Sequence, residues 1–258
     1  MRQINIALLL LALPLSGCAS RPDYTLNLPF NSDWVNVIIN LPAQTEVMPM
    51  DVLYRSDICQ REDYDSTTES HIRKERGYNP QIISMIPQSG NNIWQGKIFL
   101  DGGGKCKWKL SVIRIDLQPN PTMSLSKGKE IIQTSYAFRF DNEDYVGGGG
   151  VGSVKVSDGD LVLKTILFPM VVINNALNKQ SLRYFAGDVS KEKWSRHYKV
   201  NNVKNITIEP YLYIDKVVML ESPKNKDAPA GMTITDPDGK VELKRAIIPD
   251  YERLLSMQ

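Results

Sequence analysis

The sequence predicts a mainly β protein, an antiparallel β-sandwich built as one large or two small stacked units. Three observations lead to this fold class. Many short runs alternate apolar and polar residues, turn residues separate these runs, and few segments have helical spacing. The 258 residues are 42% hydrophobic and 23% charged, as is ordinary for a globular protein. The net charge of +2 gives no long-range field with which to hold nucleic acid, so nucleic acid is not an expected partner.

The first half of the chain contains the clearest strand patterns. From Cys106 to Leu117 the apolar residues share one parity as far as Val112 and the opposite parity from Ile113, which predicts a β-bulge. The other strands expected in this half are Trp34–Ile39, Val47–Tyr54, Ile82–Ile86, Ile93–Leu100 and Glu130–Phe140.

Residues 61–79 are rich in charge and have no apolar spacing that would bury one face, so they are predicted to form a long exposed loop with one helical turn near 69–76. Aromatic and arginine side chains in this segment have the composition of interface anchors. An ordinary solvated loop is the alternative. The candidate partner-binding residues are Tyr64, His71, Arg73, Arg76 and Tyr78.

The second half has one ambiguous element. Leu161–Ile173 is apolar enough for a buried helix, but its β-branched residues and Pro169 favour a buried strand. The remaining expectations are a short helix near 174–185, one long or two short strands over Ile206–Leu220, a hairpin of Met232–Thr235 with Val241–Lys244, and a C-terminal helix over Asp250–Met257.

The N-terminus has the order of a secretory signal peptide, with Arg2 followed by an apolar run from Ile6 to Leu15. That run is too short to cross a membrane, which needs about 20 residues in a helix. The residues Leu15-Ser16-Gly17-Cys18 that close it resemble the lipobox of bacterial lipoproteins. The resemblance implies that residues 1–17 are removed and that Cys18 is acylated, whereas an ordinary secretory signal with a chance cysteine is the alternative.

No aspartate follows Cys18, so the resemblance implies the inner leaflet of the bacterial outer membrane, with the protein facing the periplasm. Residues 18–33 are polar and non-periodic and are expected to form a flexible tether. Residues 34–258 are then the globular body, and the glycine-rich region 142–160 is a candidate boundary within it.

The three cysteines are then accounted for. With Cys18 acylated, Cys59 and Cys106 remain as a pair in an oxidising compartment, which predicts a disulfide. Two unpaired buried thiols are the alternative. A zinc site is disfavoured because the cysteines and histidines do not have ligand spacing.

The sequence contains no recognisable catalytic motif. The sequence has no Gly-x-Ser-x-Gly elbow and no His-Glu-x-x-His pair, and only His71 and His197 are available as a base. Gly102-Gly103-Gly104-Lys105 lacks the spacing of a phosphate-binding loop, and the acidic turns lack the pattern of a calcium loop. We therefore expect no enzyme activity, no cofactor and no bound metal.

Three segments resemble a group of proteobacterial lipoproteins encoded beside phospholipase effectors of the type VI secretion system. They are Met48–Cys59, Leu100–Leu110 and Ile208–Tyr213, which with the lipobox cover about an eighth of the chain. The resemblance implies an immunity protein that binds and neutralises a cognate lipase at the membrane. The alternative is an envelope-assembly or secretion-apparatus lipoprotein with a docking role, and a cell-wall or glycan hydrolase with paired carboxylates is a third.

Overall fold

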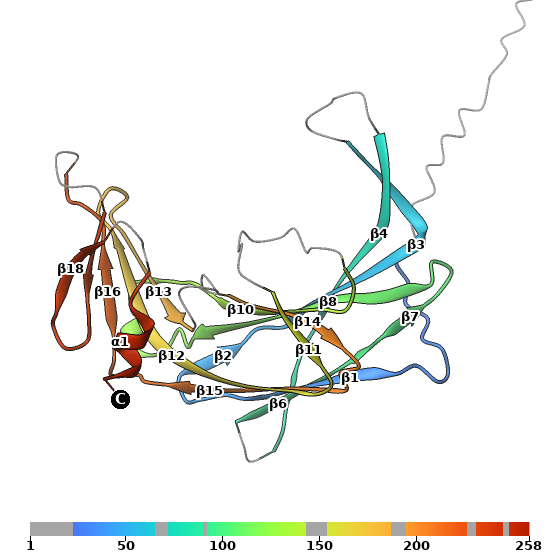
Figure 1. Ribbon diagram of the computed structural model, residues 1–258, viewed down its shortest axis with the longest axis horizontal. Coiled ribbons are helices and arrows are strands. Elements are labelled where there is room, and N and C mark those ends of the chain that lie inside the picture. The colour runs from blue at the N-terminus through green and yellow to red at the C-terminus, as the bar shows by residue number, and fades with distance from the viewer. Residues whose placement is uncertain are drawn as a thin grey trace, which may run out of the picture.

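The computed structural model describes residues 23–64, 72–89, 92–142, 154–186, 195–225, 231–244 and 248–257. Within these ranges the chain is mainly β-structure, which confirms the predicted fold class (Figure 1). Two sheets pack face to face as a sandwich. A long hairpin extends from one end of the sandwich, and a second group of strands forms a lobe at the other end.

The first sheet runs through both the sandwich and the lobe. In spatial order it contains β18 (Val241–Lys244), β17 (Met232–Thr235), β16 (Val218–Glu221), β12 (Leu161–Asn174), β15 (Asn205–Leu212), β1 (Trp34–Asn40), β6 (Ile93–Phe99) and β5 (Ile86–Pro87), with β13 (Lys179–Phe185) beside β12 and β9 (Glu130–Ile131) beside β13.

The second sheet forms the other layer of the sandwich. It contains β11 (Lys155–Asp158), β14 (Ser195–Asn201), β10 (Thr134–Arg139), β8 (Trp108–Pro119), β3 (Met50–Tyr64) and β4 (Ile72–Ile83), with β2 (Thr45–Val47) and β7 (Asp101–Gly103) both beside β8. The helical elements described are a 3₁₀ turn, η1 (Ser124–Ser126), and α1 (Tyr251–Leu255), which lies inside the predicted C-terminal helix.

The sheets of this sandwich are mixed and contain parallel as well as antiparallel pairs. β1 pairs in parallel with β15, and β10 pairs in parallel with β14. Parallel neighbours need a crossover connection rather than a tight turn. These partners are far apart in the sequence, so the local turn signals, which indicate hairpins, contain no information about them.

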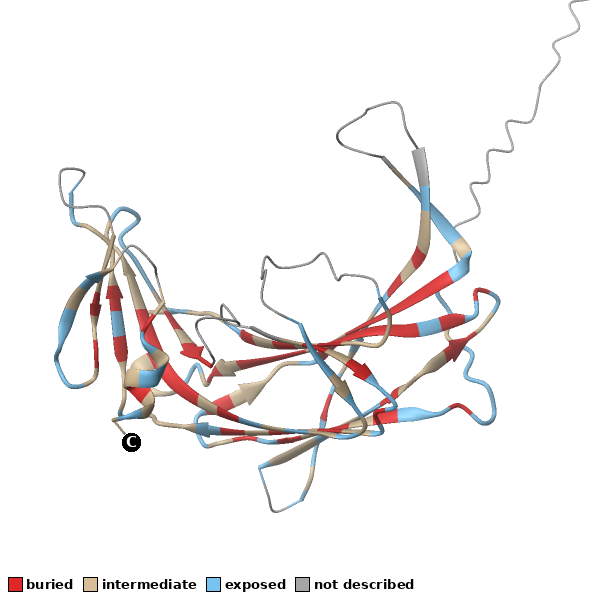
Figure 2. Ribbon diagram, in the orientation of Figure 1, coloured by how far each residue is buried: buried red, intermediate tan, exposed pale blue. Residues whose placement is uncertain are grey.

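The sandwich core forms where the inward faces of the two sheets meet (Figure 2). One sheet contributes the buried side chains of Val35, Val37 and Ile39 from β1, which alternate with more exposed residues as the sequence pattern requires. The other sheet contributes the largest buried side chains, among them Trp108 and Tyr54. The Tyr54 hydroxyl donates to the carbonyl of Phe99, 2.9 Å away, so this polar atom is satisfied within the core.

The bulge predicted in β8 is confirmed. Leu53 of β3 pairs with Val112, but the next residue, Tyr54, pairs with Leu110, so Ser111 is the extra residue. Because of the bulge, Trp108 and Leu110 lie in the same core as Ile113, although odd and even positions along the strand exchange faces at Ser111.

The predicted strand at 161–173 is confirmed as β12, which belongs to both parts of the molecule. Its first half pairs with β15, and its second half lies between β13 and β16. Exposed and half-buried residues alternate in the first half, whereas Leu167–Val171 are all buried. Both faces of the strand are covered there, since Phe168 faces one cluster of apolar residues and Leu167 faces another.

The helix expected near 174–185 is wrong. β12 ends at Asn174, a turn follows, and Lys179–Phe185 returns as β13. The buried residues Leu182 and Tyr184 are two apart, which is a strand period, and Asn178 adopts a positive φ of 49° in the turn. Leu182 and Tyr184 therefore lie in an extended strand that pairs with β12, beside the apolar residues of that strand.

The predicted C-terminal hairpin is confirmed as β17 and β18, and of the two alternatives for 206–220 the structure has two strands, β15 and β16. Helix α1 packs on this lobe. The side chain of Asp250 caps its N-terminus by accepting from the Arg253 N–H at 3.1 Å, and the Arg253 guanidinium pairs with Asp236 at 2.7 Å. The hairpin turn and the C-terminus are thereby held together.

The lobe depends on Phe168, whose ring centroid lies 5.6 Å from that of Tyr213 and 6.1 Å from that of Tyr251. We expect Phe168→Ala to lower the free energy of unfolding by about 3–5 kcal/mol, because it leaves a cavity among aromatic rings. Val162→Ala is the matched control, since Val162 lies in the same strand but is 60% exposed and should cost less than about 1 kcal/mol. Urea unfolding of both variants measures the difference, and equal losses would contradict a lobe core centred on Phe168.

Candidate interaction surface

The segment predicted to be an exposed loop is instead the extension of β3 and β4 into a long hairpin, here called the arm (residues 57–64 and 72–77; Figure 1). The loop prediction is therefore wrong. Opposite charges face each other across the two strands, with Arg61 paired to Glu75 and Glu62 paired to Lys74. Such pairs stabilise a two-stranded ribbon without a buried face, so the apolar period that indicates a strand is absent.

The arm bends where it leaves the sandwich. Ser56 pairs with Gly77, but the next pair along is Arg61 with Glu75, so four residues of β3 lie opposite one residue of β4. A Cβ on Gly77 would lie 1.9 Å from the Cys59 carbonyl oxygen. The bend therefore requires glycine at this position, because the bulged backbone of β3 contacts it directly.

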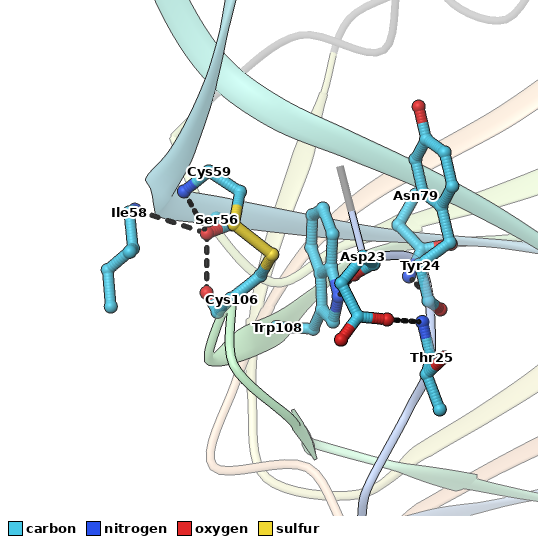
Figure 3. Close-up of a disulfide and its surroundings, with 9 residues drawn as sticks. All are labelled: Asp23, Tyr24, Thr25, Ser56, Ile58, Cys59, Asn79, Cys106 and Trp108. Carbon is cyan, nitrogen blue, oxygen red and sulfur yellow. Dashed lines mark hydrogen bonds between the residues drawn. A yellow bond between two sulfur atoms is a disulfide. The ribbon is translucent and has the colours of Figure 1, made fainter. Parts of the chain in front are cut away.

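The predicted disulfide fixes this bend (Figure 3). Cys59 in the bulge is bonded to Cys106 in the turn before β8, with their Cα atoms 5.3 Å apart. The buried Ser56 hydroxyl donates to the Cys106 carbonyl and accepts from the N–H groups of Ile58 and Cys59, at 3.1 and 2.9 Å. The backbone groups released by the bulge are thus partly satisfied, and the arm is attached to the sandwich at two points.

Arg76 holds the base of the arm from the other strand. Its guanidinium lies 2.7 Å from a carboxylate oxygen of Asp57 and 3.0 Å from one of Asp141, which follows β10. These pairs join three segments that are distant in the sequence. Arg76 was predicted as a partner-binding residue, and the structure places it in contacts that position the arm.

Tyr78 lies next to arginine side chains on the same side of the hairpin. The guanidinium carbon of Arg61 lies 5.5 Å from the Tyr78 ring centroid, and that of Arg55 lies 6.0 Å from it. A pocket of about 110 Å³ adjoins Tyr78 on the outer face of the sheet, and its wall includes Leu53, Val112 and Arg114. This combination of an aromatic ring, arginines and a small apolar hollow is typical of interface anchors.

The other predicted partner-binding residues are only partly described. Tyr64 ends β3, and Arg73 lies in β4 opposite Asp63, but the side chains of Tyr64 and Arg73 are outside the described part. His71 and Cys18 lie outside the described residues entirely. The backbone therefore brings Tyr64, Arg73, Arg76 and Tyr78 onto one hairpin, as their clustering in the sequence suggested.

The N-terminal segment is attached beside the disulfide, which the sequence did not indicate (Figure 3). The Trp108 indole N–H donates to the carbonyl of Asp23 at 2.9 Å, and the Asn79 amide donates to the carbonyl of Tyr24 at 2.9 Å. The Tyr24 ring stacks on Trp108 at 6.2 Å. The Thr25 N–H holds the pKa of the Asp23 carboxyl below its ordinary value. Over residues 23–33, the expected flexible tether is in contact with the body.

The three consecutive glycines Gly102–Gly104 make room for the attached N-terminal segment. Asn27 N–H donates to the Gly102 carbonyl at 2.9 Å, and a Cβ on Gly103 would lie 2.0 Å from the Asn27 carbonyl oxygen. Gly103 also adopts a positive φ of 58°. The turn is followed by a strand, β8. Because glycine has no Cβ, these residues allow the N-terminal segment to approach the backbone closely.

We expect replacement of both Cys59 and Cys106 by alanine to lower the free energy of unfolding by about 4 kcal/mol in the chain-entropy model, given a sequence separation of 47 residues. Amide hydrogen exchange should rise most in the arm, because the bend loses its covalent attachment. The β17–β18 hairpin is the internal control. An equal rise in both hairpins would show that the disulfide does not hold the arm in particular.

Among the described residues, no group of three His, Cys, Asp or Glu side chains is placed to hold a metal ion. No helix in the same ranges is long and apolar enough to cross a membrane. His197 lies in β14 and is half-buried. Comparisons with family models, curated proteins and solved structures find no match to this chain.

Proposed function

We propose that this chain is a lipid-anchored immunity protein that binds and neutralises a cognate phospholipase effector in the periplasm. The observation that carries the proposal is the arm, a charged hairpin with Tyr78 at its base, held at a fixed angle by the disulfide and by Arg76. The lipobox and the three segments that resemble immunity lipoproteins support the same function.

A fixed arm suits tight binding. Association costs free energy for every flexible side chain or loop that becomes ordered, and a preorganised surface avoids part of that cost. The contacts of Cys59, Ser56 and Arg76 order the base of the arm before any partner arrives. Tyrosine and arginine are enriched among residues whose truncation costs most at interfaces, and Arg55, Arg61 and Tyr78 lie close together here.

Inhibition on this proposal is steric. The protein covers the lipase surface through which phospholipid enters, or holds the lipase closed, and makes or breaks no bond itself. An interface of this kind should bury about 1,600 Å² in total. Acylation of Cys18 would concentrate the inhibitor on the surface that the lipase attacks, which raises its effective concentration without a new contact.

The first prediction concerns the arm. The double variant Glu62→Ala/Lys74→Ala removes one charge of each sign from a cross-strand pair. We expect it to weaken inhibition of the lipase encoded by the neighbouring gene by about tenfold, because both side chains are exposed on the arm and a loss of about 1.4 kcal/mol of contacts corresponds to a factor of ten in affinity. Inhibition constants from phospholipid hydrolysis measure the change.

The control is Glu242→Ala/Lys244→Ala on the β17–β18 hairpin, where the two side chains are paired at 3.0 Å. It leaves the net charge unchanged in the same way and should not affect inhibition. A lipase whose activity and elution are unchanged by the wild-type protein would refute the immunity function. Recovery of secretion-apparatus subunits instead of a lipase would favour the docking role.

The second prediction concerns the anchor. We expect Cys18→Ser to move the protein from the membrane fraction to the soluble fraction and to reduce protection of cells against the lipase. Inhibition in detergent-free solution with a soluble substrate should be unchanged, because Cys18 precedes the described body. Fractionation and mass spectrometry of the N-terminal peptide measure these effects. Wild-type protein without an acyl chain would contradict the anchor and leave the inhibition assay unaffected.

A further inference from the structure

We propose that the end of the sandwich that carries the N-terminal segment rests on the phospholipid surface through an aromatic patch, so that the body is oriented and not merely tethered. The proposal rests on the acylation of Cys18 proposed above. The patch, here called the N-terminal patch, consists of Tyr24, Leu28, Phe30 and Trp34. The segment that carries these residues runs beside β7, at the end of the molecule opposite the lobe (Figure 1).

The patch is exposed to an unusual degree. Phe30 is fully exposed, and Tyr24, Leu28 and Trp34 each expose 40% or more of their surface. Four aromatic side chains are exposed in the described part of the chain, and three of them are Tyr24, Phe30 and Trp34. Single exposed apolar residues are ordinary, but a group of them marks an interaction site.

The patch is held in place by the body rather than carried on a loose segment. Asn27 forms a bridge with Gly103, and the carbonyl of Asp33 accepts from the Leu100 N–H at 2.8 Å. Trp34 begins β1 opposite Phe99, and their ring centroids lie 6.5 Å apart. The segment that carries the exposed rings is thus attached to the body at Asn27, Asp33 and Trp34.

The composition of the patch fits the interface between headgroups and acyl chains. Tryptophan and tyrosine are enriched at that depth, with lysines nearby whose amines reach the headgroups. The Lys97 amine lies 3.5 Å from the centroid of the Trp34 ring, and Lys105 and Lys107 are exposed in the adjoining turn. Asp33 and Asp57 are exposed at the same end, so apolar insertion rather than net charge should drive the contact.

The position of the proposed anchor indicates that a membrane is what the N-terminal patch contacts. Five Cα–Cα steps separate Cys18 from Asp23, whose carbonyl accepts from Trp108. A stretch of that length spans at most about 18 Å, so acyl chains on Cys18 bring this end of the sandwich to the bilayer surface. An aromatic side chain that inserts about 5–10 Å, to the acyl boundary, would then be within reach of lipid.

The experiment uses the acylated full-length chain in vesicles of phosphatidylethanolamine and phosphatidylglycerol whose acyl chains are brominated. Phe30→Cys provides a labelling site for the fluorophore nitrobenzoxadiazole, since Cys59 and Cys106 are bonded to each other. Val241→Cys is the matched control, because Val241 is 61% exposed in the lobe at the far end.

We expect brominated lipid to quench about half of the fluorescence at position 30, as for a group at the headgroup and acyl boundary, and little at position 241. Equal quenching at the two positions would overturn the proposal. A dimer that is cross-linked on the vesicles through the unlabelled thiol of the Phe30→Cys variant would also overturn it, because position 30 would then contact a second copy of the chain and not lipid. The mass of the N-terminal peptide is measured on the same sample. Acylated protein without quenching at position 30 refutes the patch alone, whereas protein without the acyl chain refutes the anchor.

Discussion

The turn between β7 and β8 joins the main parts of the molecule. Cys106 in this turn is bonded to the arm through Cys59, and Trp108 just after it is buried in the sandwich core while its indole N–H holds the carbonyl of Asp23. The same few residues therefore contact the arm, the core and the N-terminal segment. A shift of this turn would move all three, so the position of the arm relative to the N-terminal segment is set by one short turn that carries half of the disulfide.

Much of the fold was predictable because local patterns determine it. Both strands of the hairpin of Met232–Thr235 with Val241–Lys244 were predicted with the observed bounds, because the turn chemistry lies in the short segment between them. The bulge at Ser111 followed from a change of parity that has no other simple cause. The disulfide followed from counting cysteines once Cys18 had been assigned to acylation.

The errors arose where structure depends on distant partners. The arm lacks a buried face, and its strands are recognisable only when Arg61 and Glu75 are seen opposite each other. The segment near Leu182 could be taken as a helix because its apolar residues become a strand face only beside β12. For the candidate site, the candidate partner-binding residues Tyr64, Arg73, Arg76 and Tyr78 are close in the sequence, and the structure has their backbone on one hairpin. The sequence did not show that Arg76 would be engaged with Asp57 and Asp141.

The arm and the N-terminal segment from Asp23 onward lie at the same end of the molecule, and this neighbourhood has a mechanical consequence. An inhibitor on a long loose tether samples many orientations, so its binding surface faces the lipase only part of the time. Here Trp108 and Asn79 donate hydrogen bonds to the carbonyls of Asp23 and Tyr24, so the chain is attached to the body from residue 23 onward. If the N-terminal patch also contacts lipid, the bend at Gly77 holds the arm at a set angle to the membrane. On the function proposed here, the lipase would also act at that membrane, and an arm held in this way would face it there.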